Sequence, residues 1–242
     1  MSYKAICFDI DGTLYPIGVM NRRILRLSML HPVFGVKYRK NRHEFRRCQG
    51  AFTQKVPLRW REAMILQNEA GDEPSKAFCE DDYRGTYDKL QRCIYAPMRR
   101  LYAKTKTFDG VEKTLSAIRA KGLKVGVFTD FPLFDNKLEG LGIAHLVDFA
   151  ASSDDVGYLK PDTHCLQYLL YNLKMDAKDV LYVGDSYDKD ILGSHAAGID
   201  AVLVNVRRSD LADSAKRYPL AKAVFCTWSD FDAWLMANMG ED

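Results

Sequence analysis

The sequence has few of the features that mark disulfide-bonded, zinc-binding or membrane proteins. Six cysteines occur among 242 residues, but none forms a C-x-x-C pair, so neither a disulfide framework nor a zinc site is indicated. No apolar run approaches the ~20 residues that a membrane-spanning helix needs, and the first residues lack the basic-then-apolar pattern of a secretory signal. We therefore expect reduced thiols, no membrane association and a cytoplasmic location.

Motifs of several other enzyme classes are also missing. Neither G-x-G-x-x-G nor G-x-x-x-x-G-K-[ST] occurs, so a nucleotide site built on such a glycine loop is not supported. Ser186 lies in the sequence Gly-Asp-Ser rather than in G-x-S-x-G, which disfavours a serine nucleophile. The five histidines show no metal-ligand spacing, and we interpret them as surface or packing residues.

What the sequence does contain is a regular alternation after residue 107. Helix-length amphipathic segments alternate with short apolar runs, and the runs include "LKVGVFTD", "DVLYVGD" and "AVLVNV". This alternation predicts an α/β fold with a Rossmann-like parallel sheet and helices on both faces. Gly122, Gly140 and Gly198 stand where helices are expected to end.

Residues 18–104 lack this alternation and are rich in Arg, Leu, Met and aromatic residues, which indicates helices. We therefore predict an α/β core domain of residues 1–17 and 105–242 and a mainly α-helical domain of residues 18–104. Residues 22–61 hold twelve basic residues and one acid, Glu44. Such a run is typical of a solvated face, and the alternative is attraction of an anionic ligand.

Polar residues follow the predicted strands, where the carboxyl ends of a parallel sheet gather functional groups. Four strand ends could thus meet at one pocket. A cluster of carboxylates there would repel itself without a cation, and ligands that are all oxygen suit Mg²⁺. The residues at these ends are Asp9, Asp11, Thr129, Asp130, Lys160, Asp185, Asp188 and Asp190.

Four short motifs carry a resemblance to a known family. They are D-x-D-G-T at residues 9–13, a threonine at the end of the next core strand (Thr129), the pair Lys160-Pro161, and G-D-x-x-x-x-D at residues 184–190. In this order they resemble the haloacid dehalogenase superfamily of aspartyl-phosphate-forming hydrolases. The helical domain also stands where many members carry a cap module after the first strand.

The resemblance implies a magnesium-dependent phosphatase that acts on a small phosphate monoester. Asp9 would be the nucleophile that becomes a transient aspartyl-phosphate. Asp11 would protonate the leaving oxygen and then deprotonate the attacking water, while Thr129 and Lys160 would hold the phosphoryl oxygens. The implied metal ligands are Asp9, the backbone carbonyl of Asp11, Asp185, and Asp190 directly or through water.

Other functions stay open at this point. An acid at Asp11 favours phosphoryl transfer over the dehalogenase activity of some relatives, but a phosphomutase would use the same acid. The basic helical domain suits a substrate with a second anionic group. Alternatively, its basic residues, with Phe34, Tyr38, Phe45 and Phe52 among them, suit a nucleic-acid-binding protein. The substrate, and the choice between a monomer and a homodimer, are not determined by the sequence.

Two acids near the motifs match none of the family's positions. We expect Asp130 and Asp188 to cap helices or to face solvent. We also expect a C-terminal helix capped at Ser229 or Asp230.

Overall fold

The structure is a computed structural model of the chain. It describes residues 3–18, 21, 22, 25, 29, 32–48, 56–68, 78–102, 104–134 and 137–239.

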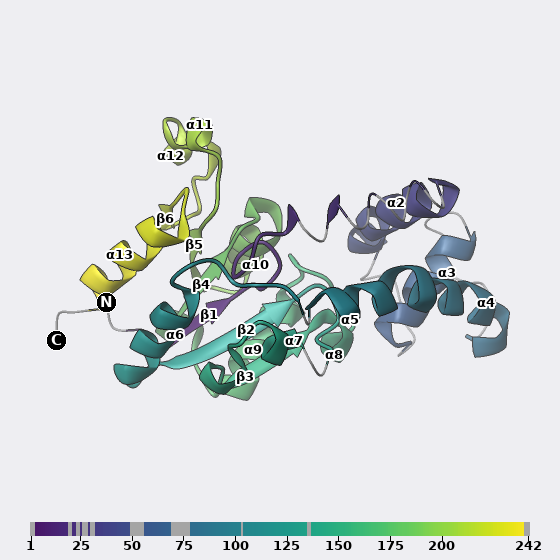
Figure 1. Ribbon diagram of the computed structural model, residues 1–242, viewed down its shortest axis with the longest axis horizontal. Coiled ribbons are helices and arrows are strands. Elements are labelled where there is room, and N and C mark those ends of the chain that lie inside the picture. The colour runs from purple at the N-terminus through teal and green to yellow at the C-terminus, as the bar shows by residue number, and fades with distance from the viewer. Residues whose placement is uncertain are drawn as a thin grey trace.

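The core is a six-stranded sheet whose strands are all parallel, in the order β3-β2-β1-β4-β5-β6. β1 therefore lies between β2 and β4, although β2 follows it in the chain by more than a hundred residues (Figure 1). The strands are β1 (Ala5–Phe8), β2 (Lys124–Thr129), β3 (Phe149–Ser152), β4 (Val180–Gly184), β5 (Asp200–Leu203) and β6 (Ala223–Val224). The predicted parallel sheet is confirmed.

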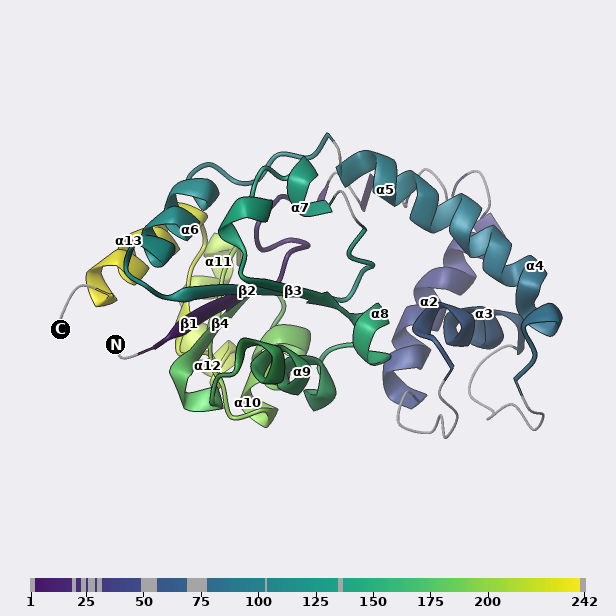
Figure 2. The ribbon, with the colours of Figure 1, turned by 90° about the horizontal axis from the view of Figure 1, so that it is seen from below.

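Helices cover both faces of this sheet, as predicted. Figure 2 shows α6 and α13 on one side of the strands and α9 and α10 on the other. Successive side chains of a strand point to opposite faces. Accordingly, Ile6 and Phe8 pack in one buried cluster with α6 and α13, while Ala5 and Cys7 pack in a second with α9. These core helices are α6 (Val111–Ala120), α7 (Lys137–Gly140), η3 (Ala144–Leu146), α8 (Ser153–Val156), α9 (Thr163–Leu173), η4 (Ala177–Asp179), η5 (Tyr187–Ile191), α10 (Leu192–Ala196), α11 (Arg208–Leu211), α12 (Ser214–Arg217) and α13 (Trp228–Asn238).

A helical segment lies between β1 and β2 in the chain. In Figures 1 and 2 it stands beyond the carboxyl ends of the strands. No helix among the described residues is long and apolar enough to span a bilayer. The limits predicted for the two domains remain a prediction. The segment contains α2 (Pro32–Cys48), α3 (Leu58–Asn68), α4 (Glu80–Leu90), η2 (Gln91–Tyr95) and α5 (Ala96–Tyr102).

Two arginines of α2 join the helical segment to the end of β2. Arg46 forms an ion pair with Asp130 at 2.6 Å, and its Nε donates to the backbone oxygen of Lys160 at 3.0 Å. Arg42 pairs with Glu62 of α3 at 2.7 Å and donates to the backbone oxygen of Asp130 at 3.2 Å. These cations therefore hold α2 against the strand ends.

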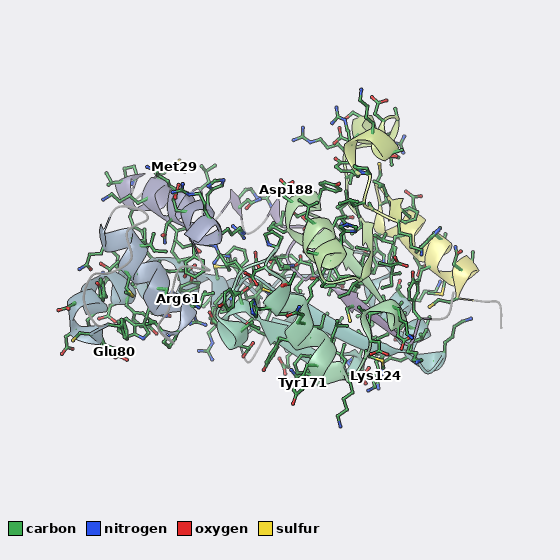
Figure 3. The ribbon with its side chains drawn as sticks, turned by 180° about the vertical axis from the view of Figure 1, so that it is seen from behind. Met29, Arg61, Glu80, Lys124, Tyr171 and Asp188 are labelled. Atoms are coloured by element: carbon green, nitrogen blue, oxygen red, sulfur yellow. The ribbon has the colours of Figure 1, made fainter. Side chains whose placement is uncertain are left out.

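Two arginines of α3 make a second connection, to α8 and the turn after it. Arg59 Nε donates to Asp154 Oδ2 at 2.7 Å, and Arg61 donates to the backbone oxygen of Gly157. Figure 3 shows Arg61 where the helical segment meets the core. Part of the basic run in the sequence thus serves contacts within the protein.

Two local expectations were wrong. Asp130 is only 6% exposed, because Arg46, the backbone N–H of Lys160 and the Ser153 hydroxyl all converge on its carboxylate. Thr227 caps α13 by accepting from the backbone N–H of Asp230, because its hydroxyl is the side chain in reach of that N–H. Helix α7 ends at Gly140, as expected. Asp188 is exposed, as expected (Figure 3).

The buried carboxylate of Asp130 is expected to make the folding stability depend on pH. Burial raises the pKa of Asp130, but the cations of Arg46, Lys160 and Arg42 outweigh burial and hold it below its ordinary value. A carboxylate with a lowered pKa stabilises the fold above the unfolded pKa of about 4, and this stabilisation is lost as the pH falls further. Between about pH 6 and pH 3, wild-type unfolding free energy should therefore fall more than that of Asp130→Asn, by on the order of 1 kcal/mol.

Urea denaturation at several pH values measures this difference, and Asp188→Asn serves as the exposed control. The control should follow the wild-type curve. Parallel curves for wild type and Asp130→Asn would show that the carboxylate of Asp130 does not stabilise the fold.

Candidate active site

The first strand ends in a buried turn that carries two carboxylates. The backbone N–H of Asp9 donates to the carbonyl of Val183 at 2.9 Å, which keeps this turn beside β4. Asp9 and Asp11 are each only 5% exposed. Gly12 follows with φ +106°, and a Cβ there would lie 2.1 Å from Asp185 Oδ2. Only glycine allows this approach, so the D-x-D-G-T motif brings the ends of β1 and β4 together.

Lys160 lies between two of the buried acids. Its Nζ is 2.6 Å from Asp9 Oδ1 and 2.5 Å from Asp190 Oδ1, and it donates to the hydroxyl of Tyr182 at 3.2 Å. Thr13 donates to the other oxygen of Asp9 at 3.3 Å. The side chain of Lys160 is 2% exposed, so water cannot replace these partners.

Asp11 has a separate set of partners. Lys137 Nζ is 2.7 Å from Asp11 Oδ2, and the hydroxyl of Thr129 donates to the same oxygen. Oδ1 accepts from the hydroxyls of Tyr15 and, at 2.9 Å, Tyr102. The two aspartates of the motif, although only two residues apart, therefore each have their own ammonium group.

Three carboxylates, those of Asp9, Asp185 and Asp190, form a cluster. One oxygen each of Asp9, Asp185 and Asp190 lies within 4.8 Å of the others, which is close enough to share a metal ion. Asp190 Oδ2 also accepts from the backbone N–H of Ser186 at 3.0 Å. Asp185 Oδ1 is buried, and no described residue donates a hydrogen bond to it. The carboxylate of Asp11 does not belong to this group.

Burial and like charge determine the protonation of these acids. Burial raises the pKa of Asp9 to about 8; the Lys160 ammonium opposes the rise, while Asp190 and Asp185 add to it. Burial also raises the pKa of Asp185 to about 6, with Asp190 adding to the shift. For Asp11, burial acts in the same direction, but Lys137 and the hydroxyl donors outweigh it and lower the pKa below its ordinary value. The pKa of Asp9 is thus raised, whereas the pKa of Asp11, two residues later, is lowered.

The predicted site residues meet in one place. Thr129 comes from the end of β2, Asp185 follows β4, and Lys160 follows α8. Thr129 donates to Asp11, Lys160 contacts both Asp9 and Asp190, and one oxygen of Asp185 lies within 4.8 Å of oxygens of Asp9 and Asp190. Their catalytic and metal-binding roles remain predictions.

Four polar residues of the site were missed in the sequence. Tyr15 and Tyr102 border the helical segment, and Asn205, with φ +59°, donates to the carbonyl of Gly12 at 2.7 Å. Lys137 begins the short helix α7. None of the four stands in a motif, and in the sequence each is an ordinary polar residue that no pattern marks as functional. The four-residue spacing from Asp11 to Tyr15 was the one local hint.

Comparisons with known proteins agree with this geometry. The sequence profile described as haloacid dehalogenase-like hydrolase matches residues 3–198. Glyceraldehyde 3-phosphate phosphatase of Methanothermobacter thermautotrophicus is 25% identical over 84% of this chain and 85% of its own length. Ribulose-1,5-bisphosphate 5-phosphatase of Halopiger xanaduensis is 26% identical over 88% of this chain and 90% of its own.

Solved structures resemble the fold over nearly its whole length. A magnesium-bound HAD hydrolase of Bacillus subtilis, YfnB, has a TM-score of 0.64 at 17% identity, covering 97% of this chain and 99% of its own. This likeness supports the fold alone. The profile match and the curated phosphatases confirm the enzyme class predicted from the sequence, a hydrolase of phosphate monoesters. The chain belongs to the haloacid dehalogenase-like hydrolases.

Proposed function

We propose that the protein is a Mg²⁺-dependent phosphatase that hydrolyses a small phosphate monoester through an aspartyl-phosphate on Asp9. The observation that supports this most is the position of Asp9. The Lys160 ammonium lies 2.6 Å from one of its oxygens, and the carboxylates of Asp185 and Asp190 are close enough to share a metal ion with it. A buried carboxylate in such a place is poised to attack an electrophile held by cations.

The carboxylate cluster fits a divalent cation. Asp9, Asp185 and Asp190 supply only oxygen ligands, which Mg²⁺ prefers, and the unpartnered Oδ1 of Asp185 is ready to bind one. The backbone carbonyl of Asp11 would complete the protein ligands. A bound Mg²⁺ would neutralise charge on the phosphoryl group and favour the ionised forms of Asp9 and Asp185.

The size of the repulsion between a carboxylate and a phosphate indicates why cations are required. A carboxylate that approaches a phosphate dianion at ~3–4 Å meets a repulsion of roughly 4–5 kcal/mol per pair of unit charges, at an effective dielectric near 20. That repulsion alone would slow attack by several powers of ten. Lys160 offsets it beside Asp9, and Thr129 and Lys160 would hold the phosphoryl oxygens.

Asp11 would serve as the general acid and base. The negative charge of a bound phosphate would oppose the cation beside Asp11 and raise its pKa, so that Asp11 could take up a proton. In the first step this proton would pass to the leaving oxygen as the bond to phosphorus breaks. In the second step its carboxylate would take a proton from the water that attacks the aspartyl-phosphate. Tyr15, Tyr102, Thr129 and Lys137 keep this carboxylate in one orientation.

The phosphomutase alternative shares these steps and differs in the fate of the phosphoryl group. The nucleic-acid-binding alternative is weakened by the contacts of the basic run. Arg42, Arg46, Arg59 and Arg61 are each engaged with protein oxygens, and so are not free for a phosphate backbone.

Phosphate release tests the proposal. Wild type with Mg²⁺ and p-nitrophenyl phosphate should release inorganic phosphate, and Asp9→Asn should release it at least about a thousandfold more slowly, because the nucleophile is lost. Asp188→Asn, an exposed acid near Asp190, is the matched control and should behave as wild type. Undiminished release by Asp9→Asn would refute the proposal, and an isomerised sugar phosphate without free phosphate would indicate the mutase.

Metal binding can be measured without turnover. Mg²⁺ that binds the carboxylate cluster stabilises the native state, so the Tm of wild type should rise with Mg²⁺ concentration. Asp185→Asn should weaken this rise, since the substitution removes a charged ligand, while Asp188→Asn should keep it. Equal Mg²⁺ responses in all three proteins would place the ion elsewhere. Differential scanning fluorimetry in chelator-treated buffer provides the measurement.

The substrate is proposed to carry a second anionic group, which α2 would contact. Arg42 is 8% exposed and reaches the residues after β2, with its guanidinium 4.8 Å from the Phe131 ring centroid. The Tyr38 hydroxyl is buried and interacts electrostatically with Arg42 and with the side chain of Tyr95. A substrate group that reaches α2 would therefore meet the Tyr38 hydroxyl beside the Arg42–Glu62 ion pair.

A set of three esters tests this specificity. Phosphoglycolate and ribulose 1,5-bisphosphate carry a second anion, and glyceraldehyde 3-phosphate does not. We expect higher kcat/KM for the first two, and Tyr38→Phe should reduce that preference by on the order of tenfold, because one hydrogen bond to a charged group is lost. Equal kcat/KM for all three esters would exclude a role for the second charge.

A further inference from the structure

Lys137 is a buried cation that no motif of the sequence accounts for. Its side chain has no solvent exposure, and its Nζ lies 2.7 Å from Asp11 Oδ2 and 3.3 Å from the Thr129 hydroxyl. The same ammonium stands 4.4 Å from the centroid of the Tyr102 ring. Full burial of an ammonium is costly unless a charge partner compensates for it, and here the partner is Asp11.

The contacts of the two buried lysines divide between the two motif aspartates. Lys160 contacts Asp9 and Asp190, whereas Lys137 contacts Asp11. Four described groups donate to Asp11, and Lys137 is the one among them that carries a charge. The direct contacts that support Asp11 are therefore separate from those of the nucleophile.

We propose that Lys137 is a positioning residue for the acid–base step, acting through Asp11. This inference rests on the proposed function. When the bond between phosphorus and the leaving oxygen breaks, the leaving oxygen keeps the electron pair and takes the proton of Asp11, which becomes a carboxylate. Lys137 stabilises that new negative charge and, with Thr129, holds Oδ2 so that the carboxyl group keeps its orientation.

This role has a specific kinetic signature. An aryl phosphate with an acidic phenol as leaving group needs little protonation, whereas an alkyl phosphate depends on the general acid, which contributes about 10²–10⁴-fold. Loss of Lys137 should therefore slow alkyl esters much more than aryl esters. Loss of Lys160, which supports Asp9 and the phosphoryl group, should slow both to a similar extent.

The test compares kcat/KM for p-nitrophenyl phosphate and glycerol phosphate in wild type, Lys137→Met and Lys160→Met, because kcat/KM reports the transfer to Asp9 and not the later hydrolysis that both esters share. For Lys137→Met we expect kcat/KM to fall about a hundredfold or more on glycerol phosphate and less than about tenfold on the aryl ester. In an Asp11→Asn background, Lys137→Met should add little further loss, because both residues act in one step.

Several results would overturn the inference. Equal losses of kcat/KM on the two esters, or a full additional loss in the Asp11→Asn background, would each contradict it. Lys137→Gln, which keeps a polar side chain, serves if the methionine variant does not fold; failure of both to fold would assign Lys137 a structural role. Wild type that releases phosphate from neither ester would refute the proposed function itself, which separates the two failures.

Discussion

The arrangement of the site depends on the repulsion between carboxylates that are buried close together. Asp9 and Asp11 stand two residues apart at the end of β1, and Asp185 and Asp190 approach from the end of β4 and the turn after it. No fold gains stability from such a cluster alone, since each buried charge needs an opposite charge. Two buried lysines, and the cation proposed for the carboxylate cluster, meet that need.

The parallel sheet brings these groups together. β1 lies between β2 and β4, so the residues after the three strands share one edge. Gly12 then permits the contact with Asp185 that no other residue would allow. The helical segment stands over the same edge, tied to it by Arg42 and Arg46. Residues far apart in the sequence thus meet in the site because the strands that they follow are neighbours in the sheet.

Much of this could be predicted from the sequence. The alternation of apolar runs and amphipathic segments predicted the parallel sheet, because strands buried on both faces must be continuously apolar. The apolar runs that end near Asp9, Thr129 and Asp185 indicated the strand ends that converge. Patterns of this kind lie within short segments of the chain, and a strand or a helix follows from them by the regular geometry of the backbone.

The parts that could not be predicted depend on distant contacts. Lys137 appears in the sequence as an ordinary helix residue, and only the fold shows that its ammonium is enclosed beside Asp11. Asp130 was misjudged for the same reason, since Arg46 reaches it across 84 positions of the chain. Short-range spacing cannot show pairing between a helix and a strand end.

The central claim is that Asp9 itself takes the phosphoryl group. The most direct measurement is mass spectrometry of the Asp11→Asn variant, acid-quenched during reaction with p-nitrophenyl phosphate and Mg²⁺, because this substrate needs little acid while hydrolysis of the intermediate needs the base. The account predicts a phosphoryl group on the peptide that contains Asp9, and none on that peptide in an Asp9→Asn, Asp11→Asn double variant. Phosphorylation of a different residue, or phosphate release with Asp9 unmodified, would contradict it.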